Sequence, residues 1–190
     1  METNRLESFS DAVLAIIITI MVLELGVPKS GDLDALIPII PLFLAYVLSF
    51  LYIGIYWNNH HHLIKASTKV SGKILWVNLI LLFWISLFPF TTAWMAENHF
   101  APWPTVFYAI VLLMAAIFYY LLQKAIINNE DDCSILQQAV GDNKKEKISM
   151  IFYFIAIFTP FIHPFISQFL FLAVAIFWII PDPRIEKVLD

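Results

Sequence analysis

The sequence predicts an all-α membrane protein with six transmembrane helices, and its composition gives the first reason. Hydrophobic residues make up 61% of the 190 residues, and aromatic residues make up 16%. The mean hydropathy of +0.80 lies far above the range of soluble domains. The second reason is the number of apolar segments that approach or reach the length of a bilayer span. Six are expected, at residues 9–26, 36–57, 74–95, 103–122, 148–162 and 165–180.

The eleven basic residues give the third reason, because they fall almost entirely on one side of these spans. Lys and Arg gather in the cytoplasmic loops of membrane proteins. With six alternating spans and a cytoplasmic N-terminus, only Lys29 lies outside. Both termini are therefore expected to be cytoplasmic, and residues 1–190 are expected to form one six-helix domain in the cell (plasma or inner) membrane. The cytoplasmic basic residues are then Arg5, Lys65, Lys69, Lys73, Lys124, Lys144, Lys145, Lys147, Arg184 and Lys187.

The first span, residues 9–26, is an almost unbroken apolar run with one polar residue in its middle, Thr19. Helical steps of about 100° per residue place Ile16, Thr19 and Leu23 within roughly 40° of Ala12. Two branched aliphatic side chains therefore flank a hydroxyl on one narrow stripe, and a helix of this kind is suited to line a pore. The structural alternative for Thr19 is a hydrogen bond to the carbonyl four residues earlier.

Charged and polar residues precede this run, among them Arg5 and the sequence Phe9-Ser10-Asp11. A carboxylate where a membrane span begins is costly in lipid and is a candidate functional group. The structural alternative is a capping box, because Ser8 and Asp11 have the spacing of that motif. The same helical steps point Asp11 and Glu24 away from the stripe.

The second span, residues 36–57, runs into Trp57-Asn58-Asn59-His60-His61-His62, which is expected at the same membrane depth as Asp11. Metal ligands on one helix need a spacing of three or four residues, whereas consecutive histidines point about 100° apart. No resident metal is therefore expected. The alternatives are plain interfacial histidines, or a hydrogen-bond and ion-pair network with the Arg5 and Asp11 region that would hold the first helix in place.

The third span, residues 74–95, contains Asn78 in its interior and Pro89 near its outer end. An amide within a span usually forms a hydrogen bond to a neighbouring helix. Pro89 is expected to kink the helix, because proline lacks the backbone N–H that a helix interior needs.

The last three spans carry fewer diagnostic residues. The aromatic side chains of the last four spans are expected to face lipid or to pack in the core. His163 and Pro164 predict a tight hairpin between spans 148–162 and 165–180, and Pro160 is expected to kink the first of these two.

These residues together resemble the signature of the transmembrane protein 175 family of potassium channels. A chain with one six-helix unit is similar to the prokaryotic members of that family, whereas the animal members carry two units per chain. The matching positions lie in the first three spans and are Arg5, Phe9, Ser10, Asp11, Ile16, Thr19, Leu23, Glu24, residues 56–61, Asn78, Pro89 and Phe90.

The resemblance implies a homotetramer in the lipid bilayer whose first helices line a central potassium-conducting pore. It implies a hydrophobic gate at Ile16, with Leu23 as the candidate second constriction, and a threonine layer at Thr19 that contributes modest potassium selectivity. Potassium is then the permeant species, and no cofactor or nucleic-acid partner is expected. The resemblance also implies a structural motif around the pore helix, Arg5, Phe9, Ser10 and Asp11, and a supporting hydrogen-bond network, Trp57, His60, His61 and Asn78.

Two other function classes stay open from the residues alone. A proton-coupled secondary transporter would use Asp11, Glu24 and the histidine cluster 60–62 as titratable sites, although coupling sites usually lie near the middle of the membrane. An intramembrane metalloenzyme would need a spaced His and Glu motif, which this sequence lacks. We therefore expect no enzymatic activity and no catalytic residue.

Overall fold

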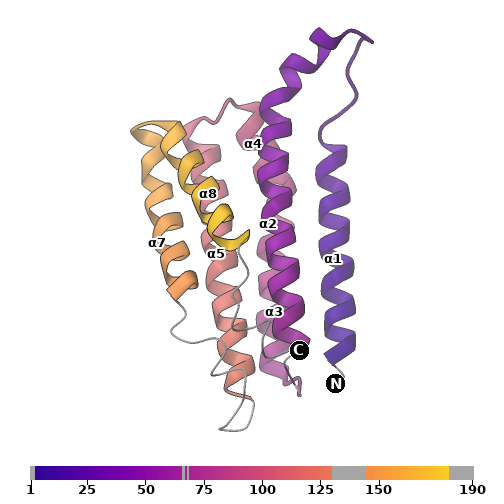
Figure 1. Cartoon of the computed structure of the whole chain (residues 1–190), viewed down its shortest axis with the longest axis vertical. Coiled ribbons are helices and arrows are strands. Elements are labelled where there is room, and N and C mark those ends of the chain that lie inside the picture. Colours follow the sequence, from indigo (N-terminus) through magenta and orange to yellow (C-terminus); the bar gives the residue numbers. More distant parts are fainter. Residues whose placement is uncertain (1–2, 66, 68, 130–143, 180–190) are drawn as a thin grey trace.

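The computed structural model describes residues 3–65, 67, 69–129 and 144–179, and all regular elements in these ranges are helical. The long helices run alongside one another as a bundle (Figure 1). Two 3₁₀ segments, η1 and η2, accompany them. The bounds are α1 Thr3–Leu23, η1 Leu33–Ile39, α2 Ile40–Lys65, α3 Gly72–Ser86, α4 Phe88–Glu97, α5 Pro102–Ile127, α7 Lys144–Phe158, η2 Thr159–Phe161 and α8 Pro164–Ile179.

Within the described residues, four helical segments are long and apolar enough to cross a membrane. They are Thr3–Leu23, Leu33–Lys65, Gly72–Glu97 and Pro102–Ile127, and α8 is a shorter apolar helix. The fifth expected span corresponds to α7, which has 15 residues. Residue 180 of the last expected span, Arg184 and Lys187 lie outside the described residues.

The first helix begins earlier than the sequence pattern suggested. Because α1 starts at Thr3, Ser8 and Asp11 lie inside the helix, and the alternative of a capping box at these two residues is wrong. The Ser8 hydroxyl instead donates to the carbonyl of Asn4, at 2.8 Å. This is the usual bond of a serine within a helix.

The second and third spans also differ from their expected outlines. Helix α2 continues to Lys65, so the three histidines are helical. The kink expected at Pro89 is a one-residue interruption at Leu87 within the span Gly72–Glu97, where α3 ends at Ser86 and α4 begins at Phe88. Pro160 lies in η2, after α7 has ended at Phe158, so this proline ends a helix and does not kink one.

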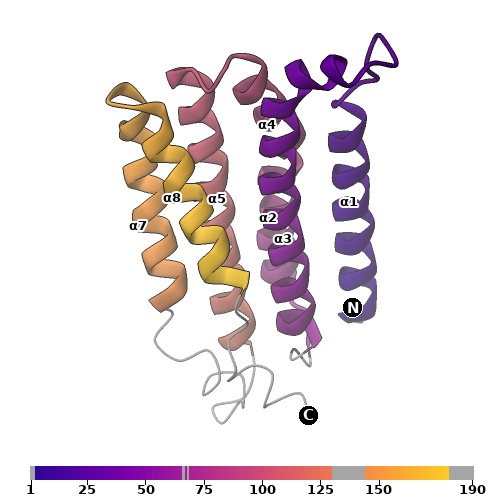
Figure 2. The ribbon, with the colours of Figure 1, turned by 45° about the horizontal axis from the view of Figure 1, so that its top comes forward.

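Helix α5 lies in the interior of the bundle, and α1 lies at one edge. Figures 1 and 2 show α1 standing apart from α5, α7 and α8, and its packing partners are α2, α3 and α4. Buried alanines on α5, among them Ala109 and Ala115, allow its neighbours to approach closely. One long face of the pore-helix candidate is therefore left without a partner in the protomer.

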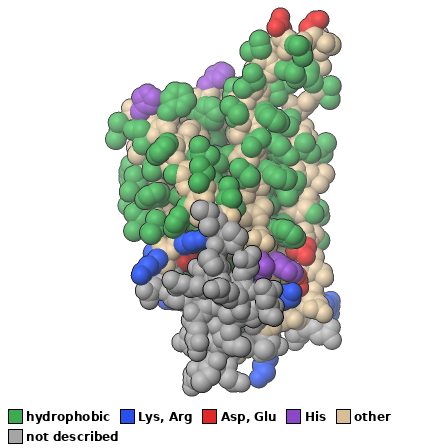
Figure 3. All heavy atoms as spheres, in the orientation of Figure 1, with side chains coloured by type: hydrophobic (Ala, Val, Ile, Leu, Met, Phe, Trp, Pro, Cys, Tyr) green, Lys and Arg blue, Asp and Glu red, His purple; other side chains and the backbone are tan. Residues whose placement is uncertain are grey.

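Side-chain chemistry follows the long axis of the bundle. Hydrophobic side chains cover the middle of the face shown in Figure 3, while charged and histidine side chains gather toward its two ends. This banding is the pattern of a protein that sits across a bilayer.

Candidate functional site

Helix α1 has one face against the bundle and an opposite face that is exposed in the protomer. The side chains of the first face pack against α2, α3 and α4 at helical spacing and are apolar except for one serine. They are Leu6, Ser10, Leu14, Ile17 and Met21.

The exposed face carries the stripe that the sequence pattern singled out. The side chains of Ile16 and Leu23 are 59% and 73% exposed, and Thr19 is exposed between them. The Thr19 hydroxyl donates to the carbonyl of Ala15 at 2.9 Å, so its proton is committed to the helix backbone. Its oxygen retains lone pairs that can accept from, or coordinate, a group outside the helix.

A buried chain of polar contacts joins the N-terminal half of α1 to α2 and α3. His60 Nε2 lies 2.7 Å from Asn78 Oδ1, and because an amide oxygen only accepts, the imidazole is the donor. Asn78 Nδ2 donates to the Ser10 hydroxyl at 3.0 Å, and that hydroxyl donates to the carbonyl of Leu6 at 2.9 Å. All three side chains are buried, so the chain ties three helices together away from water.

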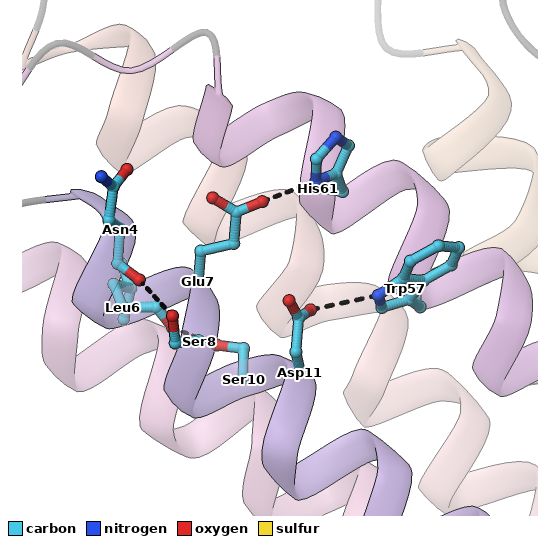
Figure 4. Close-up of polar contacts among 8 residues, drawn as sticks. All are labelled: Asn4, Leu6, Glu7, Ser8, Ser10, Asp11, Trp57 and His61. Atoms are coloured by element: carbon cyan, nitrogen blue, oxygen red, sulfur yellow. Dashed lines mark hydrogen bonds and ion pairs between the residues drawn. The ribbon is translucent and has the colours of Figure 1, made fainter.

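Two further contacts fasten α1 to α2 nearer the surface (Figure 4). Trp57 Nε1 donates to the Asp11 carboxylate at 3.1 Å, and His61 Nδ1 lies 2.6 Å from Glu7 Oε1. Figure 4 shows Glu7 and Asp11 one turn apart on α1, both directed toward α2. Glu7 was missed by sequence reasoning, and its only signal was its position four residues before Asp11 on the same helical face.

Three of the expected residues stay outside this network. Arg5 is exposed and forms no ion pair within the described part of the chain. Phe9 is exposed and lines an apolar groove whose other wall is α3, including Trp76 and Phe83. Glu24 is exposed one residue beyond the end of α1.

The three histidines have three different surroundings because they point to different sides of α2. His60 meets Asn78, His61 meets Glu7, and the ring of His62 stacks edge-on against His61. Within residues 3–65, 67, 69–129 and 144–179, no group of three His, Cys, Asp or Glu side chains is arranged to hold a metal ion. The contacts of His60 and His61 hold α2 against α3 and α1.

Comparisons with known proteins agree on one family. The family model described as "Endosomal/lysosomal potassium channel TMEM175" matches residues 5–89. A potassium channel of Chryseobacterium sp. (strain P1-3) is 53% identical over 189 residues, which are 100% of this chain and 98% of that protein. A potassium channel of Streptomyces collinus is 41% identical over 100 residues, 50% of this chain and 48% of its own.

A solved structure extends the similarity to the fold. The crystal structure of a lysosomal potassium-selective channel TMEM175 homolog from Chamaesiphon minutus superposes with a TM-score of 0.78. The two sequences are 30% identical, and the match covers 93% of this chain and 96% of the other.

Proposed function

Because this chain belongs to the TMEM175 family of potassium channels, which are multi-pass membrane proteins and not enzymes, we propose that it conducts potassium through a pore lined by α1. The observation that carries this proposal is the exposed stripe of Ile16, Thr19 and Leu23 on the face of α1 opposite the buried one. Because these side chains are exposed in the protomer, packing within the protomer does not account for their positions.

A pore requires several copies of α1 around one axis, because a single helix cannot enclose water. Closed cyclic symmetry turns each stripe residue into a ring of identical side chains. We propose a homotetramer, as the resemblance to the family implies. The position of α1 at the edge of the protomer supports this arrangement, since it allows four copies to meet without moving the other helices.

The protomer presents an apolar surface on each side of α1, and both surfaces are suited to contacts between neighbouring protomers in such a ring. On one side lies the apolar groove between α1 and α3, lined by Phe9, Val13 and Trp76 among others. On the other side α2 presents an exposed apolar stripe that includes Phe43, Phe50 and Trp57. A head-to-tail ring pairs two different surfaces of this kind at every interface.

Ile16 forms the gate in this proposal, and Leu23 is the candidate second constriction about two turns further along the helix. A ring of branched aliphatic side chains lines a neck with no group to replace the water around an ion. When such a neck narrows below the width of a hydrated ion it loses its water, and conduction stops. A small outward movement of the helices would rehydrate it.

Thr19 supplies the oxygen layer between these two rings. Since its proton is held by the Ala15 carbonyl, each hydroxyl offers lone pairs to a partly dehydrated cation. Potassium loses water more readily than sodium, so neutral oxygens favour it modestly. The carbonyl filter sequence Thr-Val-Gly-Tyr-Gly is absent from the chain, which agrees with modest selectivity.

The polar network in the N-terminal half of α1 would fix the rotation of this helix about its own axis. The contacts of Ser10 and Asn78, together with those of Glu7 and Asp11 to α2, hold one side of α1 against the bundle. The opposite side must then face the axis. The distribution of basic residues supports cytoplasmic termini, so the network would lie at the cytoplasmic mouth of a channel in the plasma or inner membrane.

The test is potassium and sodium flux through the purified protein in liposomes, with wild type beside Ile16→Asn. The polar side chain should wet the neck, so passive cation flux should rise in the variant. Val22→Asn is the matched control, because Val22 is also exposed but lies about 100° around the helix from Leu23. Unchanged or lower flux in a normally assembled Ile16→Asn protein would exclude the gate. Absence of passive flux in both proteins would favour a transporter that uses Asp11, Glu24 and the histidines.

A further inference from the structure

The apolar groove between α1 and α3 is a candidate binding site in its own right. Its volume is about 410 Å³, more than ten times the share of one molecule in liquid water, roughly 30 Å³. Helix α1 contributes Phe9 and Val13 to the lining, and the residues from α3 run from Trp76 to Ser86. All the lining residues except Ser86 are hydrophobic, so the groove suits an elongated apolar ligand.

The groove has the length of one leaflet of a bilayer. The helical steps from Trp76 to Ser86 rise about 15 Å, which is half of a hydrocarbon core of roughly 30 Å. Both residues belong to the candidate span Gly72–Glu97, in which Trp76 lies near one end and Ser86 lies near the middle. The groove therefore runs from the membrane surface toward the centre of the bilayer, as one lipid acyl chain does.

Two basic residues, Arg5 of α1 and Lys73 of α3, lie about one helical turn beyond the surface end of the groove. Each precedes the first lining residue of its own helix by three or four positions. The two helices run in the same direction (Figures 1 and 2), and the hydrogen bond from Asn78 Nδ2 to the Ser10 hydroxyl fixes their register. Since Arg5 and Lys73 each precede their helix's partner in that bond by five positions, they lie at the same depth.

The charges of these two residues are not compensated within the described part of the chain. Both side chains are exposed, and neither takes part in an ion pair with a described residue. Helix α3 contains no acidic residue, and the two carboxylates of α1, Glu7 and Asp11, are directed toward α2 (Figure 4). The surface end of the groove is therefore positively charged, while its interior is apolar.

We propose that this groove binds an acyl chain of an anionic phospholipid, such as phosphatidylglycerol, whose phosphate is bound by Arg5 and Lys73. Guanidinium and ammonium groups both bind phosphate oxygens through charge-assisted hydrogen bonds. The apolar lining removes the methylene groups of one chain from other contacts, and the two charges select the headgroup. A zwitterionic lipid has the same chains but carries a cation beside its phosphate, which Arg5 and Lys73 repel.

A flexible chain fits a long open groove better than the side chains of a neighbouring protomer do. Rigid helices that meet over a groove leave part of it empty, and empty apolar space forfeits dispersion contacts. An acyl chain adapts to the groove and gives the neighbour a more even surface. In the tetramer proposed above, the lipid would lie at the boundary between protomers. That position rests on the proposed function, whereas the binding itself needs only the protomer and a bilayer.

Native mass spectrometry of the purified full-length protein tests the headgroup preference, with equal amounts of phosphatidylglycerol and phosphatidylcholine of identical acyl chains added in mild detergent. The wild type should retain one phosphatidylglycerol per protomer, with a several-fold preference over phosphatidylcholine. Arg5→Gln combined with Lys73→Gln should lose this preference. Lys65→Gln combined with Lys124→Gln is the matched control, because it removes two exposed charges from α2 and α5 and should keep the preference. Equal retention of the two lipids by the wild type, or equal losses in the two double variants, would overturn the proposal.

Val13→Trp tests the groove separately from the charges. The larger side chain should fill the groove and displace the lipid, while circular dichroism shows the helix content of the wild type. Val22→Trp is the control, because Val22 lies on the same helix, is exposed and does not line the groove. Full retention of phosphatidylglycerol by a folded Val13→Trp protein would show that the groove does not hold the chain, and would overturn the proposal.

Crystals grown with phosphatidylglycerol that is brominated in the middle of its chains test the site without any variant. Anomalous bromine peaks inside the groove are the expected result. A groove filled by side chains of a neighbouring copy, with no bromine, would overturn the proposal and assign the groove to the contact between protomers. None of these measurements requires ion conduction, so failure of the lipid site and failure of the proposed channel would be separate results.

Discussion

The imidazole of His60 lies 2.7 Å from the side-chain oxygen of Asn78, and both side chains are buried between α2 and α3. Asn78 also contacts α1, because its amide nitrogen donates a hydrogen bond to the Ser10 hydroxyl. The side-chain amide of Asn78 on α3 thus accepts a hydrogen bond from His60 on α2 and donates one to Ser10 on α1. The orientation of α1 relative to the bundle therefore depends on a residue that never touches the exposed stripe.

Asn78→Ala is expected to lower the free energy of unfolding by about 1–3 kcal/mol, because it leaves the buried His60 donor unsatisfied. Denaturation of the detergent-purified protein measures the loss. Asn4→Ala is the control, since Asn4 is exposed and its role in the structure comes from its backbone carbonyl. Equal stability of the two variants would remove Asn78 from the network.

Thr19→Ala is expected to shift the ratio of potassium to sodium permeability without abolishing flux, because the proposed oxygen layer is lost while the proposed neck at Ile16 keeps its width. Reversal potentials under bi-ionic conditions give the ratio. Thr19→Ser, which restores the hydroxyl, should keep the ratio near that of the wild type. A wild-type ratio in Thr19→Ala would show that selectivity arises elsewhere.

Asp11 and Trp57 should be energetically coupled, since the indole N–H donates to the carboxylate at 3.1 Å. The double-mutant cycle of Asp11→Ala and Trp57→Phe is expected to give a coupling energy of about 1 kcal/mol. Denaturant unfolding of the four proteins supplies the cycle. Strictly additive effects would mean that the contact does not stabilise the protein in solution.

Arg5→Ala is expected to weaken the assembly and to leave the protomer intact. Arg5 is exposed, forms no ion pair within the described residues, and lies on the same side of α1 as the stripe. Size-exclusion chromatography in mild detergent should show smaller species for this variant, while circular dichroism should show unchanged helix content. Elution of Arg5→Ala at the position of the wild type would contradict a role between protomers.

Much of α1 could be predicted from the sequence because helical periodicity is a local property. The positions of Ile16, Thr19 and Leu23 on one face follow from 3.6 residues per turn, and the exposure of the three side chains agrees with it. The bond of Thr19 to Ala15 was also foreseeable, since it stays within one turn. The start of α1 was not, because the polar residues that precede the apolar run, such as Glu7, are compatible with either a loop or a helix.

The roles of the three histidines could not be separated before the structure was known. They are chemically identical and adjacent, and consecutive helical positions differ by about 100° in direction. Only the packing of α2 against α1 and α3 brings His60 to Asn78 and His61 to Glu7.

Composition and helical periodicity were enough to predict the helical class, the main apolar segments and the residues that share the exposed face of α1. These depend on composition and on the regular geometry of a helix, which neighbouring residues set without help from the rest of the chain. The packing of the helices establishes which polar side chains meet, that Glu7 joins the network, and that Glu146 is buried beside Gln123. Such contacts join residues 54, 68 or 23 positions apart, and only the packing of whole helices brings groups that distant in sequence within hydrogen-bonding distance.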